Sequence, residues 1–342
     1  MPFQGDFAFC QSHFIDIIPL QLKSVILCFS KKLQKMNRKR GLGIILPTII
    51  IINLGIFVLL ITGSSPTPED GAENNEISTL FTPVKIPDSV TFAGELIPLS
   101  RFDVRESLDR ELLVNSYFHS QTLRLLKLAP RYFSVIEPIL KEKGMPDDLK
   151  YLAVAESGLN PRAISPAGAV GLWQFMHGTA REYGLTINNE IDERYHIEKS
   201  TFAACDYLMK SFQRFETWSM VAAAYNAGNS GVQRQMLRQK NSSYFDLLFN
   251  EETARYFYRI IALKLIMENP GTYNFVIADD ERYPVIPTRD VVITGRVADF
   301  ADFAATHGIS YKLLKDFNPW LRESFLTNAG GKKYTVKIPI LD

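Results

Sequence analysis

The sequence predicts an all-α domain followed by a small α+β module, both behind a single membrane-spanning segment. Three observations lead to this prediction. Helical periodicity recurs from about residue 100 to 270, Pro and β-branched residues become frequent after Pro270-Gly271, and an apolar stretch without charge precedes both regions. A run of helical patterns without strands between them is typical of an all-α domain. With 342 residues, the chain is long enough for two domains of ordinary size.

Residues 41–63 have the composition of a transmembrane helix. No charge occurs from Gly41 to Pro68, and the almost wholly apolar core of this stretch suits a bilayer crossing of about 20 residues. Basic residues precede the stretch and acidic residues follow it, so the positive-inside rule places residues 1–40 in the cytoplasm and the rest outside. We expect an uncleaved anchor. A cleaved signal peptide, processed near Thr62 to Ser65, is the alternative.

The formal net charge of +1 averages two unlike parts of the chain. Residues 1–40 contain seven Lys and Arg against two Asp, which leaves 31 basic and 35 acidic residues in the remainder. An exported part that is acidic overall gives no reason to expect a nucleic-acid partner. We expect Met36 to be the initiator, because basic residues follow it directly before the anchor. Only Cys205 lies beyond the anchor, so no disulfide is expected there.

Residues 64–99 read as a flexible tether that continues into an extended lead-in. The tether is rich in Pro, Gly, Asn and acidic residues, and alternating apolar residues follow it from Val84 to Phe92. The region 100–270 then shows helical spacing with short Gly- and Asn-rich loops. Helices are expected over residues 103–126, 132–141, 147–157, about 171–183, 198–214, 217–226 and 251–268.

The last part of the chain predicts a small βααβ module. After a linker at 271–289, residues 290–342 begin with a β-branched run, continue with helical spacing over 297–307 and 311–317, and end in a strand over 334–339. A module of this size is too small to hold an active site of its own.

Glu156 is a carboxylate where an amphipathic helix should carry an apolar residue. Pro146 and two Asp residues are typical of a helix start, and Gly158 of its end. Glu156 continues the i, i+3, i+4, i+7 stripe that begins at Leu149, so its carboxyl group should point inward or into a cleft. Desolvation and the negative end of the helix would both raise its pKa. Glu156 is therefore a candidate general acid, and a structural ion pair is an equally good interpretation of this helix alone.

Three other strings carry side chains suited to ligand binding. The string GLWQF is expected to open a helix and to present Gln174, whose amide both donates and accepts hydrogen bonds. The string AAAYNAG closes a helix and places Tyr225 and Asn226 at its rim. The turn-rich loop after Gly158 can bring Ser165 back toward the Glu156 carboxyl. Taken singly, each string is more often structural than functional.

The order of these strings resembles that of the lytic transglycosylases with a goose-type, lysozyme-like catalytic domain, and specifically the membrane-bound D-type enzymes. The resemblance covers about residues 100–268 and rests on Glu156-Ser157, GLWQF, the triplet 224–226, and Glu252-Thr253 near Tyr256. It implies an all-α lysozyme-like catalytic domain with Glu156 as the single acid and base. It also implies substrate contacts from Ser165, Gln174, Tyr225 and Asn226, and supporting roles for Ser157 and Glu252.

Two further segments extend the resemblance and also depart from it. The string Asp192-Glu193-Arg194 matches the family, whereas Tyr195, His196 and Ile197 stand where its members usually have Arg, Asp and Pro. The three acidic residues at 190–193 lie in a loop, where charged side chains are usually solvated. The tail resembles a divergent LysM module, a fold that binds N-acetylglucosamine chains, with TGRV at 294–297 in place of the usual Gly-Asp-Thr. A structural or spacing role is the alternative for this module.

The resemblance implies that the substrate is peptidoglycan, cut between N-acetylmuramic acid and N-acetylglucosamine with closure of a 1,6-anhydro ring. Substrate-assisted chemistry removes the need for a second carboxylate. No cofactor and no metal are expected. A hydrolytic muramidase on the same fold and a non-catalytic wall-binding protein are the alternatives. The expected location is the bacterial inner membrane, with a single crossing and the catalytic part in the periplasm. Secretion to the periplasm after signal cleavage is the alternative location.

Overall fold

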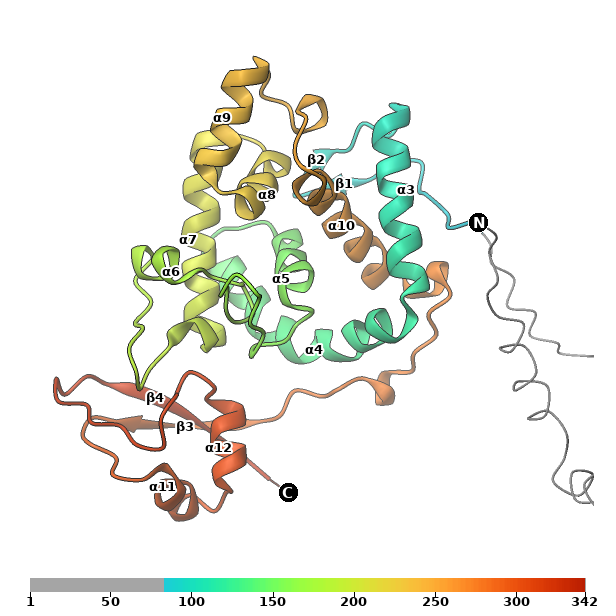
Figure 1. Cartoon of the computed structure of the whole chain (residues 1–342). Coiled ribbons are helices and arrows are strands. Elements are labelled where there is room, and N and C mark those ends of the chain that lie inside the picture. The colour runs from blue at the N-terminus through green and yellow to red at the C-terminus, as the bar shows by residue number, and fades with distance from the viewer. Residues whose placement is uncertain (1–82, 342) are drawn as a thin grey trace, which may run out of the picture. The chain divides into compact units, whose positions relative to one another are not determined.

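The computed structural model describes residues 83–341 of the 342-residue chain, and within them it is mainly helical (Figure 1). A two-residue hairpin comes first, formed by β1 (Thr91–Phe92) and β2 (Glu95–Leu96). We call residues 102–273 the helical part. Its helices are α3 (Phe102–Tyr117), α4 (His119–Glu142), α5 (Lys150–Ser157), α6 (His177–Glu182), α7 (Ile197–Phe215), α8 (Trp218–Ala227), α9 (Asn229–Gln239) and α10 (Glu251–Glu268).

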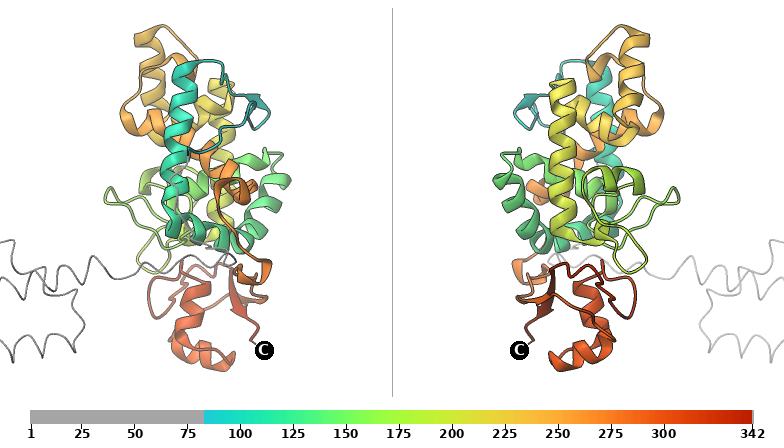
Figure 2. Two further views of the ribbon diagram at one scale, coloured as in Figure 1. Left: turned by 90° about the vertical axis from the view of Figure 1, so that its right-hand side faces the viewer. Right: turned by 90° about the vertical axis from the view of Figure 1, so that its left-hand side faces the viewer.

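Helix α10 is the element around which the helical part is packed. It contacts α3, α5 and α8, and Figure 1 shows it running between them. Phe257, Ile260 and Ile261 on α10 are fully buried, and Asn250 caps its first turn by accepting a hydrogen bond from the Thr253 backbone N–H. Helix α7 packs against α4 and α8 and faces the viewer in the right-hand view of Figure 2. The shared core fixes the ends of α5, α8 and α10 relative to one another.

Helix α5 begins and ends close to the predicted positions. A 3₁₀ turn (η1, Asp147–Leu149) leads into it, and Gly158 closes it with a left-handed backbone at φ 58°. The Gly158 N–H bonds the Val154 carbonyl, which is the C-terminal arrangement that glycine favours. The prediction of a helix over 147–157 with Glu156 in its last turn is therefore confirmed.

The first two predicted helices have different boundaries in the structure. The predicted helices over 103–126 and 132–141 left a gap at 127–131, but α4 continues through this gap, including Pro130, to Glu142. The chain instead breaks at Phe118, where the Thr122 hydroxyl donates to the Asn115 carbonyl across the break at 2.6 Å. Burial of one face of α4, from Leu125 onward, outweighs the backbone donor that Pro130 lacks.

The predicted helix over 171–183 is wrong in its first half. Helix α6 covers only His177–Glu182, and residues 171–175 form a turn. Gly171 and Gln174 both have left-handed backbones, at φ 83° and 50°, which a helix does not permit. Helix α9 was not predicted, and the hairpin β1–β2 adds a short pair of strands before the helices.

The C-terminal module (residues 288–339) has the predicted βααβ order. Strands β3 (Thr288–Ile293) and β4 (Tyr334–Pro339) pair antiparallel, with Val291 opposite Val336, and enclose helices α11 (Phe300–Thr306) and α12 (Tyr311–Phe317). The apolar faces of both helices and the strand pair form a second buried cluster. The expected fold class, an all-α domain followed by a small α+β module, is confirmed.

The predicted membrane anchor at 41–63 lies outside the described residues and stays a prediction. Within residues 83–341, none of the helices has the length and apolar character that a bilayer crossing requires.

Candidate active site

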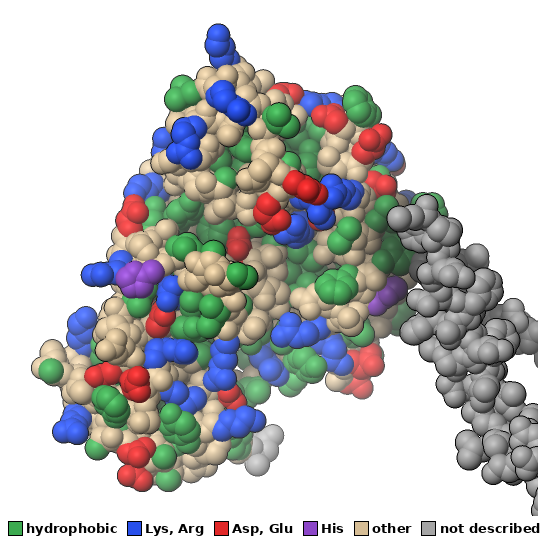
Figure 3. Space-filling model, in the orientation of Figure 1, with side chains coloured by type: hydrophobic (Ala, Val, Ile, Leu, Met, Phe, Trp, Pro, Cys, Tyr) green, Lys and Arg blue, Asp and Glu red, His purple; other side chains and the backbone are tan. Residues whose placement is uncertain are grey.

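The carboxyl group of Glu156 lies where α5 meets α10. It is half-buried in the last turn of α5, and its Oε1 accepts a hydrogen bond of 2.5 Å from the hydroxyl of Tyr256, a fully buried residue of α10. In Figure 3 the face toward the viewer is hollowed where α5, α8 and α10 come together in Figure 1. Hydrophobic and uncharged side chains line this hollow, and charged ones gather along its edge.

Burial raises the pKa of Glu156 from 4.5 to about 7. The charged form is disfavoured because it loses hydration. The Tyr256 hydrogen bond and the charge of Arg259 act in the opposite direction and lower the pKa, whereas the charge of Glu252 raises it. Near neutral pH, Glu156 can therefore either give up or take up a proton, which is the property that acid and base catalysis requires.

Helix α10 presents three polar side chains to this carboxyl from one face. Glu252, Tyr256 and Arg259 follow the spacing i, i+4, i+7, so they are neighbours along α10. Glu252 is 60% exposed, and one of its oxygens lies 3.0 Å from Nη1 of Arg259. Tyr256 and Arg259 had no assigned role in the sequence interpretation. Their spacing from Glu252 was the available signal.

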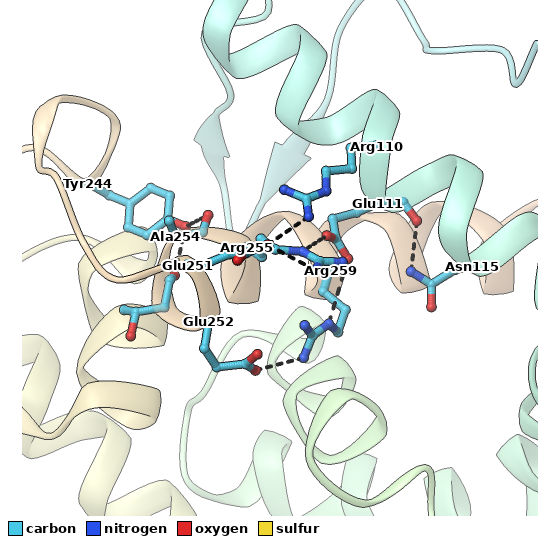
Figure 4. Close-up of polar contacts among 10 residues, drawn as sticks. Arg110, Glu111, Asn115, Tyr244, Glu251, Glu252, Ala254, Arg255 and Arg259 are labelled. Carbon is cyan, nitrogen blue, oxygen red and sulfur yellow. Dashed lines mark hydrogen bonds and ion pairs between the residues drawn. The ribbon is translucent and has the colours of Figure 1, made fainter. Parts of the chain in front are cut away.

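Arg259 also belongs to a network of ion pairs between α3 and α10 (Figure 4). Glu111 on α3 is 1% exposed and accepts a hydrogen bond of 2.6 Å from Nε of Arg255, while Nε of Arg259 lies 3.6 Å from its other carboxylate oxygen. Glu251 accepts a hydrogen bond from Arg110 at 2.8 Å at the outer end of the network. The network therefore links the α3–α10 contact to the surroundings of Glu156 through Arg259.

Tyr225 and Asn226 occupy the end of α8, as predicted. The Tyr225 hydroxyl donates to the Trp173 carbonyl at 2.7 Å, and burial together with the neighbouring Glu156 charge raises the pKa of Tyr225 far above its usual value. The amide oxygen of Asn226 accepts a hydrogen bond of 2.7 Å from the Thr253 hydroxyl. Tyr225 thus joins α8 to the segment before α6, and Asn226 joins it to α10.

Ser165 and Gln174 lie in one loop, residues 163–175, which we call the Ser165 loop. The Ser165 hydroxyl accepts a hydrogen bond of 2.9 Å from the Ala169 N–H and so holds the turn closed. The amide nitrogen of Gln174 donates to the carbonyls of Gly171 at 2.7 Å and Ala163 at 3.2 Å. Both side chains order the loop itself, and neither has a hydrogen bond to Glu156 among the described contacts.

Ser157, beside Glu156, and the acidic residues Asp192 and Glu193 all have hydrogen-bond partners within the protein. The Ser157 hydroxyl donates back into its own helix, to the Ala153 carbonyl at 3.1 Å. Asp192 and Glu193 were expected to be solvated, which is wrong, because they are 7% and 4% exposed. Asp192 pairs with Arg194, and Glu193 pairs with Lys199 and accepts a hydrogen bond from the Thr186 N–H. Tertiary packing gives these carboxylates partners that a loop composition does not reveal.

The described residues contain no group of three or more His, Cys, Asp or Glu side chains arranged to hold a metal ion. Cys205 is the one cysteine in this part of the chain, and it is buried within α7.

Two family models match the chain. The transglycosylase SLT domain matches residues 133–248, and the soluble lytic transglycosylase C-terminal LysM-like domain matches residues 289–341. The membrane-bound lytic murein transglycosylase D of Escherichia coli, in two strains, is 31% identical over 238 residues, which are 68% of this chain and 51% of the relative. The chain thus spans about half the length of the curated relatives it matches.

Two solved structures resemble parts of the chain. The 70 kDa soluble lytic transglycosylase of Escherichia coli is 21% identical, covering 52% of this chain and 33% of that one with a TM-score of 0.37. Lytic transglycosylase Slt of Pseudomonas aeruginosa is 20% identical, covering 46% and 28% with a TM-score of 0.35.

The matched ranges agree with the position of the candidate site. Glu156, Ser165, Gln174, Tyr225 and Asn226 all lie within the first match, and strands β3 and β4 lie in or beside the second. The chain therefore carries a transglycosylase SLT domain, followed by a C-terminal LysM-like domain.

Proposed function

We propose that this protein is a peptidoglycan lytic transglycosylase. It would cleave the β-1,4 bond between N-acetylmuramic acid and N-acetylglucosamine and leave a 1,6-anhydromuramic acid end. The observation that carries the proposal is the half-buried Glu156 carboxyl, whose pKa lies at about 7 and whose hydrogen-bond partner is a neutral phenol instead of a cation. The SLT match and the names of the curated relatives support the same reaction.

In the first step, protonated Glu156 donates its proton to the glycosidic oxygen as the bond to the anomeric carbon breaks. The acetamido oxygen of the same muramic acid stabilises the cationic carbon, as in other substrate-assisted glycosidases. Glu156 is left as a carboxylate, and the Tyr256 hydroxyl and the nearby Arg259 charge both favour this charged form. The departing sugar keeps the proton as a new hydroxyl group.

In the second step, the Glu156 carboxylate takes the proton of the muramic acid 6-hydroxyl while that oxygen attacks the anomeric carbon. The ring closes, Glu156 regains its proton, and no water is consumed. A hydroxyl on the same sugar competes well with water because its attack is intramolecular. The nearest charged carboxylate on α10, Glu252, is paired with Arg259 and is assigned a supporting role, like Ser157. No cofactor or metal enters this reaction.

The substrate would lie along the hollow that Figure 3 shows where α5, α8 and α10 come together. We assign Ser165, Gln174, Tyr225 and Asn226 to the sugar subsites, because Tyr225 is close enough to Glu156 to feel its charge and bonds the Trp173 carbonyl of the Ser165 loop. Residues 100–270 would form the catalytic domain, and residues 290–342, after the linker at 271–289, a module that contacts the glycan strands.

Mass analysis of the products from purified sacculi tests the reaction. We expect termini lighter by one water than hydrolysed ends. Hydrolysed ends alone would identify a muramidase on the same fold, and an absence of any products would indicate a non-catalytic wall-binding protein. Glu156→Gln is the matched variant, because it keeps the shape of the side chain and removes the transferable proton.

We further propose that residues 41–63 anchor the protein in the bacterial inner membrane, with residues 1–40 in the cytoplasm and the catalytic part in the periplasm. The charge-free apolar stretch and the basic residues before it support this topology. Fractionation followed by protease treatment of spheroplasts tests it. A mature protein that begins near residue 65 would favour the cleaved signal peptide instead.

A further inference from the structure

The C-terminal module and the helical part share one buried apolar cluster. Phe300, Leu314, Trp320, Leu326, Val336 and Ile338 of the module are joined there by three residues from before α7, namely Val170, Ile191 and Tyr195. These three are 4%, 1% and 4% exposed. The apolar surface that these residues and the module bury against each other stabilises the contact, by roughly 25 cal/mol for each Å² removed from water.

Backbone hydrogen bonds lock the same contact in register. Ile191 pairs antiparallel with Leu321, in the manner of two short strands. The Asp192 N–H donates to the Trp320 carbonyl at 3.0 Å, and the Arg322 N–H donates to the Glu190 carbonyl at 2.8 Å. A register fixed by backbone groups distinguishes a docked module from one that swings on a tether.

Side chains close the contact on both sides of this pairing. The Trp320 ring stacks on His196 with ring centroids 5.4 Å apart, and the Arg322 guanidinium lies 4.2 Å from the centre of the Tyr195 ring. Such cation–π contacts are typically worth about 0.5–2 kcal/mol. In the helical part, Tyr195 and His196 are two of the three noted departures from the family pattern, and both lie in the docking contact.

The docking segment, residues 190–196, also grips the Ser165 loop. Asp192 holds the Arg194 guanidinium through two hydrogen bonds of 3.0 and 2.7 Å. The same guanidinium donates to the carbonyls of Gly168 and Phe175, each at 3.3 Å, and both Asp192 and Arg194 are buried. Because the guanidinium group is rigid and has several donors, Arg194 ties the Gly168 and Phe175 carbonyls of the loop to the docking segment.

Two further contacts tighten this connection. A Cβ atom on Gly171 would lie 2.0 Å from the Arg194 carbonyl oxygen, so the loop and the docking segment touch backbone to backbone. Arg162, directly before the loop, bonds the module itself, with its Nη2 atom 2.9 Å from Asp316 and 2.6 Å from the Lys315 carbonyl. The module therefore reaches the Ser165 loop both through the docking segment and directly.

We propose that the C-terminal module is a fixed brace of the Ser165 loop, with Arg162, Asp316 and Trp320 as positioning residues for the glycan. The module then works from its docked position and does not act as a glycan-binding unit at a distance from the helical part. The kinetic part of this inference rests on the proposed function, since it assumes that the Ser165 loop contacts the glycan. The docking itself does not depend on it.

A disulfide lock between Ile191→Cys and Leu321→Cys in the full-length protein tests the docked state. Opposed residues of an antiparallel pair have Cα atoms about 4.5–5.5 Å apart, within the range of about 4.4–6.8 Å that a disulfide spans. We expect the bond to form on oxidation, as seen by peptide mass mapping, with the oxidised and reduced proteins cleaving sacculi at equal rates. Failure to form the bond, or a tenfold loss of activity on locking, would overturn the proposal.

A charge swap tests the positioning role. Arg162→Asp should raise KM for glycan roughly two- to fivefold with unchanged kcat, the range expected from an exposed ion pair. Adding Asp316→Arg to that variant should restore KM. Lys312→Asp is the matched control, because it makes the same change of charge at an exposed position of α12. An equal change of KM in the control, or no recovery in the double variant, would reject the role.

Hydrogen exchange of backbone amides gives a readout that does not require catalysis. Amides of residues 168–175 should exchange faster in Arg162→Asp and in Trp320→Ala, and return to the original rate in the charge swap and in Trp320→Phe. Unchanged exchange in all of these variants would overturn the brace. Changed exchange in a protein that releases no products would leave the brace standing and reject the proposed function instead.

Discussion

Two glutamates face helix α10 from neighbouring helices, and their partners differ in kind. Glu111 on α3 is buried against the guanidinium groups of Arg255 and Arg259, whereas Glu156 on α5 meets the hydroxyl of Tyr256. An ion pair holds two helices together and needs no change of protonation. A carboxyl group that faces a neutral donor in a partly dry site can exchange its proton near neutral pH. The residue that α10 places opposite each glutamate thus decides its role. Arginines make Glu111 a structural ion-pair partner, and a tyrosine leaves Glu156 able to exchange its proton.

The largest difference between the two glutamates should appear in the rate of glycan cleavage. Glu156→Gln removes the transferable proton, so we expect kcat to fall by about 10²–10⁴-fold, the usual contribution of general acid–base catalysis. Glu111→Gln should keep kcat within a few-fold under conditions where it is folded. Product release from labelled sacculi, normalised to folded protein, measures both. A folded Glu111→Gln variant as inactive as Glu156→Gln would break the comparison.

The order of effects should reverse for stability. Glu111→Gln leaves two arginines without their buried counter-charge, and breaking a buried pair in this way typically costs about 3–5 kcal/mol of unfolding free energy. Urea unfolding at pH 7, compared with the unchanged protein, measures the loss. A change below about 1 kcal/mol, the value of an exposed ion pair, would show that this network contributes little to the fold.

Glu156→Gln should instead stabilise the protein at high pH. Folding raises the pKa of Glu156, so ionising this group costs folding free energy as the pH rises from the unfolded pKa of 4.5 through the folded pKa of about 7. We expect no difference between variant and unchanged protein at pH 4. Above pH 7.5 the variant should be more stable by at most about 3 kcal/mol, at about 1.36 kcal/mol per pKa unit. Equal stability at both pH values would contradict the raised pKa.

The smallest effects should come from the charges around Glu156. In the proposed mechanism Glu156 must be protonated to donate, so kcat/KM should decline above pH 7. Arg259→Gln removes a charge that lowers the pKa of Glu156, and should move the decline to higher pH. Glu252→Gln removes a charge that raises this pKa, and should move the decline to lower pH. The pH profiles of the two variants are each other's controls. Shifts of the same sign would contradict the electrostatic assignment.

Local patterns were enough to predict Glu156 but not its partners. The stripe that begins at Leu149 and the stop at Gly158 are properties of one helix, so the sequence locates the carboxyl correctly. Tyr256 and Arg259 face it only because α10 crosses α5, and that crossing depends on packing across the whole helical part. The pattern of one segment does not specify which face of a distant helix it will meet.

The errors around residues 171–195 have the same origin. GLWQF has helix-like apolar spacing, but the close approach of Gly171 to the Arg194 carbonyl holds this string in a turn. Asp192 and Glu193 have the surroundings of a solvated loop in the sequence, whereas the fold buries them against Arg194 and Lys199. Contacts between residues far apart in the sequence determine both the turn and the burial, and such contacts cannot be predicted from local composition.

The two hydrogen bonds of Gln174 restrict what this residue can offer a ligand. Its amide nitrogen has two hydrogens, and both are committed to carbonyls of its own loop, at Gly171 and Ala163. Only its carbonyl oxygen remains available, so a ligand group that bonds Gln174 must be a donor. A sugar presents such a donor as a hydroxyl or as the N–H of an acetamido group. The Gln174 side chain can therefore accept a hydrogen bond from a ligand, but it has no free N–H with which to donate one.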